Sequence, residues 1–228
     1  MAHPDLLEIG IYTIPEAAEL VAAPQSSVRI WIEGHTGKQE PIIINQLGRV
    51  DDKTAISFAN LMELRFVARF VKAGVKLREI RRIMSDAREM LHHPHPFATK
   101  AVVFKTDGQK IVADIARRNG LNLIYDLRSK NYEMPTVVMK SFREGVVFDP
   151  QGEAIEWTPR PKIAPNVIVH PRIEFGHPVL KHSNIPTDAI AKAVKVEGSA
   201  QFVADIFDLQ VRHVREAVKF EENLAVAA

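Results

Sequence analysis

Two helix-start signals lie close together near the N-terminus, and they constrain the fold of this chain more than any other feature. Thr13 and Glu16 have the spacing of a capping box, and Pro15 is tolerated in a first helical turn. Pro24 interrupts this first helix, and a second helix is expected over residues 25–33, before a glycine stops it. The pattern predicts two short helices joined by a tight turn.

The second of these helices has an apolar inner side and a short, polar outer side. The inner side is expected to hold Val28, Trp31 and Ile32, and the outer side Gln25, Ser26, Ser27 and Arg29. A groove-reading helix needs a buried stripe to fix its angle, and short polar residues with a cation to meet base edges or phosphates. Any capped surface helix can show such residues, so a solvated face remains the alternative.

Residues 35–50 predict a small β-hairpin, or wing, because glycines and a proline flank the apolar run 42–44. Apolar residues at helical spacing then predict longer helices over residues 57–72 and 77–91. Each of these helices carries a stripe that must be buried against another element.

Strand signals dominate the middle of the chain, and helical signals return near its end. The expected strands are 101–104, 111–115, 121–126, 146–149 and 154–157, with a short helix over 134–143. Pro159, Pro161 and Pro165 mark the expected linker. Beyond it, Thr187 is expected to cap a helix, Ser199 to start a second and Asp208 to lead into a third. The sequence predicts an α+β protein with units at 1–95, 96–160 and 161–228.

Composition excludes several classes of function. The chain has 46% hydrophobic and 25% charged residues, which is ordinary for a folded protein, and its formal net charge is only +2. It has no cysteine, so disulfides, thiolate zinc sites and thiol nucleophiles are excluded. No signal peptide or membrane span is expected, which predicts a soluble, cytoplasmic protein.

Catalysis and metal binding find little support in the sequence. The run from His92 to His95 is the one candidate zinc cluster, but it has a proline within it and no further ligand at a suitable spacing. No nucleophile and base pair, phosphate-cradling glycine loop or matched carboxylate pair stands at a recognisable interval. We therefore expect a non-enzymatic protein without a cofactor.

The N-terminal part resembles the DNA-binding domain of the MerR family. The resemblance is carried by the segments 12–18, 27–33, 64–67 and 77–84, in family order, and covers about the first 92 residues. It implies a winged helix-turn-helix whose second helix enters the major groove while the wing and the next helix hold phosphates. The DNA-binding residues so expected are Thr13, Gln25, Ser26, Ser27, Arg29, Lys38, Arg65 and Arg69. The family's sensor cysteines and long dimerising helix are absent from this sequence, so a metal-sensing activator is not expected.

The C-terminal part, from Val169 to Gly198, is similar to a small helical domain of unassigned function that occurs in VapB-type antitoxins. The resemblance implies an antitoxin whose partner is a PIN-domain ribonuclease. Such nucleases have an acidic metal site that an inserted cation could block. Arg117, Arg118 and Arg128 are the candidates for that contact.

Two clusters of basic residues are candidate surfaces for binding DNA or a protein partner. Arg65, Arg69, Lys72 and Lys76 recur at spacings of three and four, so they could form a ridge along a phosphate backbone. In the last predicted helix, Arg212, His213, Arg215 and Lys219 could form a second DNA or partner surface. The glutamates interspersed among them equally allow a protein-binding role or a solvated face.

These observations favour a DNA-binding antitoxin that regulates its own operon, binds double-stranded operator DNA as a homodimer and neutralises a PIN-domain ribonuclease. A homodimer is expected because one small reader covers too little DNA for tight specific binding. A free-standing MerR-like regulator with a small-molecule-sensing middle unit is the alternative. A third hypothesis is a protein-interaction module with a degenerate helix-turn-helix that does not bind DNA.

Overall fold

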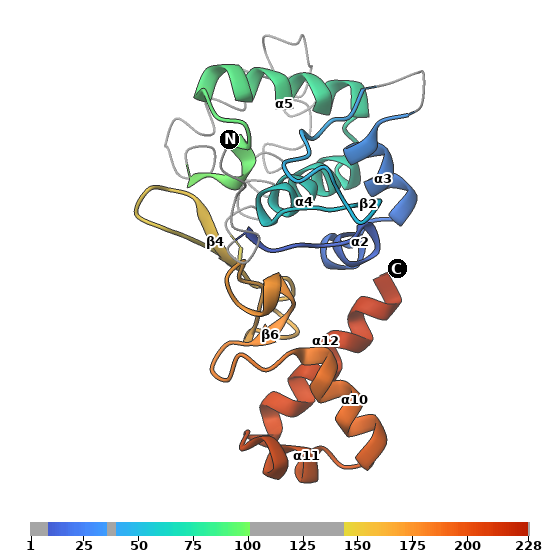
Figure 1. Cartoon of the computed structure of the whole chain (residues 1–228), viewed down its shortest axis with the longest axis vertical. Helices are drawn as coiled ribbons and strands as arrows, with labels where there is room; N and C mark the ends of the chain where they lie inside the picture. The colour runs from blue at the N-terminus through green and yellow to red at the C-terminus, as the bar shows by residue number, and fades with distance from the viewer. Residues whose placement is uncertain (1–8, 36–39, 101–143, 228) are drawn as a thin grey trace, which may run out of the picture.

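The computed structural model describes residues 9–35, 40–100 and 144–227 of the chain. Figure 1 shows the N-terminal helices in the upper part, the C-terminal helices in the lower part, and the segments with β4 and β6 between them. The described helices are α2 (Ile14–Val21), α3 (Gln25–Glu33), α4 (Phe58–Lys72), α5 (Leu77–Leu91), α10 (Thr187–Glu197), α11 (Ala200–Phe207) and α12 (Val211–Ala227). The strands are β1 (Arg49–Val50), β2 (Lys53–Thr54), β3 (Val146–Phe148), β4 (Ala154–Trp157), β5 (Val167–Ile168) and β6 (Val179–Leu180).

These strands pair in sequence order into small antiparallel sheets, β1 with β2, β3 with β4 and β5 with β6. Short 3-10 turns lie at Pro96–Ala98 and Glu174–Gly176. The combination of helices with small antiparallel sheets confirms the α+β class. None of the helices in the described ranges is both long enough and apolar enough to cross a membrane.

The capping box predicted for α2 is confirmed. The backbone N–H of Thr13 donates to a Glu16 carboxylate oxygen at 2.7 Å, and the N–H of Glu16 donates to the Thr13 hydroxyl. Ala22 then takes a left-handed conformation and α3 begins after Pro24. Val28, Trp31 and Ile32 of α3 are all buried, as predicted.

The predicted wing is displaced along the chain, which corrects the expectation for residues 35–50. Ile42 and Ile43 form no strand: both are buried, and their N–H groups donate to the Trp31 carbonyl at 2.9 and 3.0 Å. The hairpin is instead β1 and β2, joined by Asp51 and Asp52. Both aspartates have positive φ, as a two-residue turn of this handedness requires. The apolar run 42–44 reflects core packing, which a strand prediction cannot distinguish.

The helix pair α4 and α5 has the predicted limits. Ser57 caps α4 by accepting from the Asn60 N–H at 3.1 Å, and α4 is buried on nearly all sides of its first three turns. The predicted hairpin β3–β4 is also confirmed. The strands predicted at 101–104, 111–115 and 121–126 and the helix at 134–143 lie outside the described residues.

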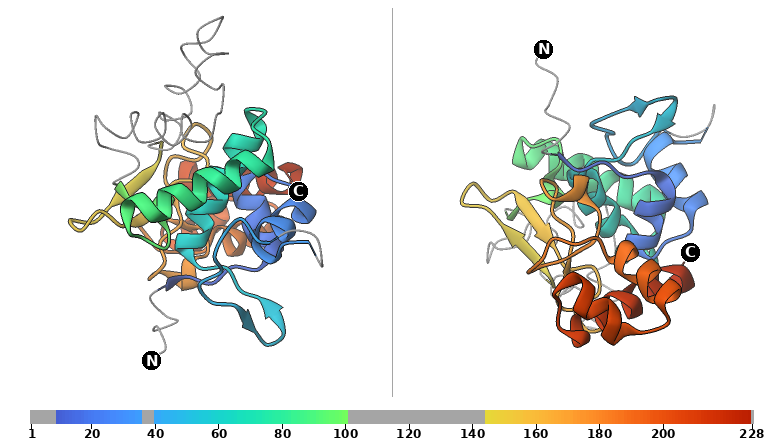
Figure 2. Two further views of the ribbon diagram at one scale, coloured as in Figure 1. Left: turned by 90° about the horizontal axis from the view of Figure 1, so that it is seen from above. Right: turned by 60° about the horizontal axis from the view of Figure 1, so that its bottom comes forward.

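The proline-rich segment expected to be a linker is tightly packed. Its Arg160 donates to the carbonyls of Glu19 at 2.9 Å and Leu20 at 2.8 Å, and to the side-chain oxygen of Asn223 at 2.8 Å. The guanidinium therefore joins the end of α2 to the end of α12, which lie close together in Figures 1 and 2. Buried apolar residues form one cluster from Tyr12 to Leu224.

The three C-terminal helices pack on one another, with Ile190, Val203, Val214 and Phe220 buried between them. Ser199 caps α11, as predicted. Thr187, expected to be the cap of α10, is instead its first residue and is fully buried. Its hydroxyl bonds the carboxylate of Glu221 and the Pro178 carbonyl, so it joins α10 to α12 rather than capping a helix.

Replacing Trp31 tests the orientation of α3. The ring is 2% exposed, and Trp31→Ala should lower the free energy of unfolding by about 3–5 kcal/mol through the cavity it leaves. Urea unfolding measures this, with Arg29→Ala as the control on the exposed side of the same helix. Equal losses in the two variants would show that α3 is rotated relative to this description.

Candidate nucleic-acid interface

The outer edge of α3 is open to solvent. Gln25, Ser26 and Arg29 are exposed and Ser27 is half-buried, while the Arg29 side chain keeps 60% of its accessible surface. For Ser26 and Arg29 this follows from the helical period, because burying positions 28, 31 and 32 turns them outward, whereas Gln25 is the first residue of α3. The edge combines short polar side chains with one cation.

The β1–β2 hairpin lies beside this edge. A hollow of about 540 Å³ is lined by Arg29, Ile32, Glu33, Asn45, Gly48, Arg49 and Thr54. A second hollow of about 360 Å³ shares Arg29, Glu33, Arg49 and Thr54 with it and extends to Thr13 and Lys53. The start of α2, the outer edge of α3 and the hairpin therefore form one continuous surface, which we call the α3–hairpin surface.

Opposite charges are interleaved on this surface. Arg29 lies 3.4 Å from Glu33, and the Thr54 hydroxyl donates to the same carboxylate from the hairpin. Arg49 donates to the Asp52 carbonyl at 3.1 Å through its Nε. An exposed ion pair such as Arg29–Glu33 contributes little to stability, and an exposed hydrogen bond such as that of Arg49 is readily exchanged for one to another acceptor. Arg29 and Arg49 can therefore turn toward a phosphate or a base edge at low cost.

Arg49 and Lys53 of the hairpin were missed by the sequence reasoning, which placed the wing earlier. The Asp51–Asp52 pair was the available signal, because aspartate tolerates the positive φ that such turns need. The predicted wing residue Lys38 lies outside the described residues, as do Arg117, Arg118 and Arg128.

The predicted phosphate ridge is wrong at Arg65. This residue is 5% exposed, its Nη2 donates to the Glu144 carbonyl at 2.9 Å, and its guanidinium carbon lies 5.4 Å from the centre of the Trp157 ring. Arg69 is half-buried, and burial lowers the pKa of both arginines. A spacing of three and four cannot tell a solvent-facing stripe from one covered by a distant segment, here residues 144–157.

Lys72, Lys76, Arg78 and Arg82 do lie exposed on the helix pair. On α12, Arg212, Arg215 and Lys219 are exposed and His213 is half-buried, with its ring 6.2 Å from that of His182. These residues lie in the C-terminal helices, apart from α3 (Figure 1).

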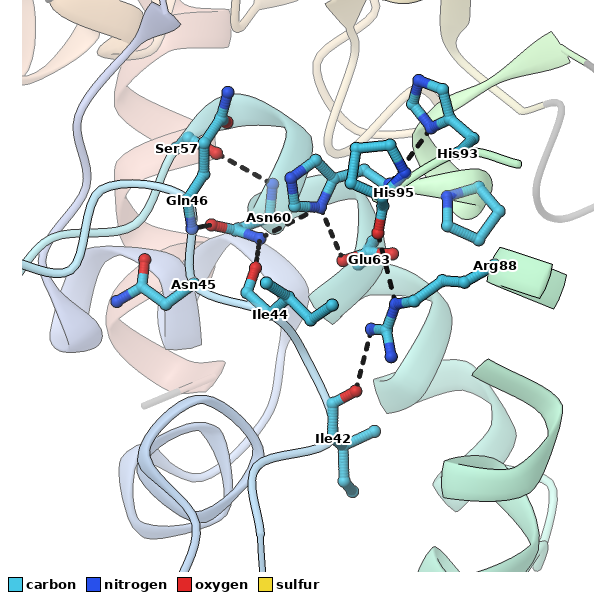
Figure 3. A network of polar contacts seen from close by, with 12 residues as sticks. Ile42, Ile44, Asn45, Gln46, Ser57, Asn60, Glu63, Arg88, His93 and His95 are labelled. Atoms are coloured by element: carbon cyan, nitrogen blue, oxygen red, sulfur yellow. Dashed lines mark hydrogen bonds and ion pairs between the residues drawn. The ribbon is translucent and has the colours of Figure 1, made fainter. Parts of the chain in front are cut away.

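A buried polar network supports the loop that leads into the hairpin (Figure 3). The Asn60 side chain accepts from the Gln46 N–H at 2.9 Å and donates to the Ile44 carbonyl at 2.8 Å. Arg88 donates to the carbonyls of Ile42 at 3.0 Å and Pro94 at 3.2 Å. The loop forms no strand here, so side chains of α4 and α5 satisfy its backbone groups.

Glu63 and His95 lie at the centre of the network (Figure 3). The carboxylate is 0% exposed and lies 3.1 Å from the His95 Nδ1. Burial raises the pKa of Glu63 above its ordinary value of 4.5, and the contact with His95 acts in the opposite direction. His93 faces a different carboxylate, Glu153, at 3.2 Å. The described residues hold no group of three or more potential metal ligands.

Known proteins resemble this chain over nearly its whole length. It is 22% identical over 227 residues to a Mycobacterium tuberculosis protein named "Putative antitoxin VapB45", covering 92% of this chain and 93% of that protein. It superimposes on the crystal structure of Rv2018 from Mycobacterium tuberculosis with a TM-score of 0.74 and 20% identity, covering 93% and 98% of the two chains. The second likeness shows a shared fold. No protein-family model matches the chain.

The direction of the Glu63 shift sets a pH dependence. Because the folded-state pKa is raised above 4.5, the folded protein binds this proton more tightly than the unfolded chain does. The residue's contribution to the free energy of unfolding is therefore present below 4.5 and lost as the pH rises through the folded pKa. Glu63→Gln removes the titration, so the stability difference should move in favour of the variant with rising pH. Urea unfolding from acid to neutral pH measures it, and a constant difference would contradict the assignment.

Proposed function

We propose that this chain is a non-catalytic, DNA-binding antitoxin that regulates its own operon and neutralises a PIN-domain ribonuclease. The antitoxin role is supported by the likeness over nearly full length to a protein with that name. The DNA-binding role rests on one observation: α3 buries its apolar stripe and leaves Gln25, Ser26 and Arg29 exposed.

In this proposal the N-terminal part acts as a MerR-like winged helix-turn-helix. The edge of α3 enters the major groove, where its short residues let the helix backbone come close to base edges. Arg49 and Lys53 of the hairpin take the place of the wing and contact phosphates beside the groove. On binding, Arg29 exchanges its exposed ion pair with Glu33 for a base edge, and this contact carries the sequence preference.

A homodimer completes the proposed reader. One helix and one short hairpin cover a single half-site, and paired half-sites supply the affinity that a specific operator requires. The arrangement also explains how a chain with a net charge of only +2 binds DNA, since two copies of the α3–hairpin surface act together.

The toxin is proposed to be a nuclease because the relative carries the VapB name. The free-standing regulator with a small-molecule pocket is the competing function, and it predicts an effector in place of a protein partner. The antitoxin and the free-standing regulator are distinguished by whether the chain binds a protein partner or a small molecule inside the cell.

Arg29→Ala should weaken binding to a duplex from the promoter of the chain's own gene by about 1–3 kcal/mol while leaving stability unchanged, because the residue is exposed. Arg49→Ala should weaken binding to all sequences and lower the salt slope by about one. Fluorescence anisotropy at several salt concentrations measures both effects. Lys162→Ala, also an exposed cation, is the control. Full binding by Arg29→Ala would remove α3 as the reader.

Co-expression tests the partner. The tagged chain should recover the product of an adjacent nuclease gene as a stable complex, and the ribonuclease activity of that product should fall when the chain is added. Excess divalent metal separates inhibition from loss of metal, because it restores activity that was lost by metal removal. Recovery of the chain alone, with a ligand-dependent change in promoter binding, would favour the free-standing regulator.

A further inference from the structure

Helix α12 presents a second basic face. Arg212, Arg215 and Lys219 are exposed, and their spacing of three and four places them on one side of the helix. The opposite side carries Val214, Ala217 and Phe220, all fully buried. The helix is therefore held firmly by its apolar side while three cations face solvent.

Two of the three glutamates of α12 make contacts with neighbouring segments, although the sequence places them among the cations. Glu216 accepts from the Asn166 N–H at 2.6 Å and from the Asn166 side-chain amide at 2.9 Å. Glu221 bonds the buried hydroxyl of Thr187. Both carboxylates are thus used to join α12 to neighbouring segments, while Glu222 on the helix and Asp208 in the turn before it are exposed acidic residues near the three cations.

The connection before α12 has the form of a helix-turn-helix. Helix α11 ends at Phe207, Asp208 takes a left-handed conformation, and α12 starts at Val211. The turn is closed by the Leu209 N–H, which donates to the Ala204 carbonyl at 2.8 Å. In helix-turn-helix proteins the helix after such a turn lies in the major groove and its first residues reach the DNA. Gln210 and Arg212 occupy that position and are exposed.

We propose that α12 is a second contact surface for duplex DNA, with Arg212, Arg215 and Lys219 on the phosphates. It does not depend on the α3–hairpin surface, since the two surfaces lie in different parts of the molecule (Figure 1). The exposed apolar residues Phe202 and Ile206 of α11 make a protein the competing occupant. The α12 face itself favours DNA, because phosphates contact cations that remain hydrated whereas a protein must desolvate all three.

Anisotropy titrations of the full chain against a random-sequence duplex test this. Replacing all three cations by alanine should weaken binding about tenfold or more at low salt and lower the salt slope by about 2–3, one counterion per lost contact. The matched control is Lys162→Ala with Lys192→Ala and Lys195→Ala, which removes the same charge from exposed positions elsewhere. Arg212→Lys with Arg215→Lys keeps the charge and should keep the slope.

An equal loss in the control triple variant would show a general charge effect and overturn the proposal. Unchanged DNA binding would overturn it as well, and loss of a co-expressed protein partner from the same variant would then assign the face to protein. Titrating Arg29→Ala and the α12 variant against the promoter duplex keeps the two surfaces separate. If only the α12 variant loses binding, the α3 reader fails and the α12 contact stands; if only Arg29→Ala does, the reverse holds.

Discussion

The burial of Trp31 determines the geometry of the α3–hairpin surface. Its ring is inside the core, which fixes the rotation of α3 and turns Arg29 to the outside. Its carbonyl accepts the N–H groups of both Ile42 and Ile43, which fixes the start of the loop leading to the hairpin. One residue thus sets the positions of both elements, so the hollow between them is a property of the packed core and not of flexible surface chains.

Irregular backbone at residues 40–48 and at residue 144 explains why several arginines are unavailable for binding. A segment without strand pairing has backbone carbonyl oxygens that still need hydrogen-bond donors. Arginine side chains are long and carry several N–H donors, so they can supply these bonds. Arg81 donates to the Glu40 carbonyl at 2.9 Å and Arg88 to the Ile42 carbonyl at 3.0 Å, while Arg65 donates to the Glu144 carbonyl at 2.9 Å. These arginines hold irregular backbone in place. The exposed cations Arg29 and Arg49 lie instead on the α3–hairpin surface.

Local signals predicted local structure well. Sequence signals correctly predicted the Thr13 capping box, the glycine after α3, the limits of α4 and α5 and the Ser199 cap, because each depends on residues within one or two turns.

The errors at the wing, at Arg65 and at Thr187 share another cause. Each residue or segment is covered by a part of the chain that is distant in sequence, such as residue 144 above Arg65 or Glu221 beside Thr187. Periodicity shows which residues share a face, but not what covers it. The exposed edge of α3 was predictable because its inner side is strongly apolar, whereas the hairpin cations could be located only from the Asp51–Asp52 turn.

The balanced composition conceals a separation of charge within the fold. Glu63, Glu216 and Glu221 are directed at His95, Asn166 and Thr187, so their carboxylates serve contacts within the structure. Arg212, Arg215 and Lys219 keep exposed side chains on the same helix as two of these glutamates. Since phosphate contacts depend on local rather than total charge, a net charge of +2 is compatible with more than one surface that attracts DNA. The acidic groups that might have prevented this are the ones that hold the C-terminal helices together.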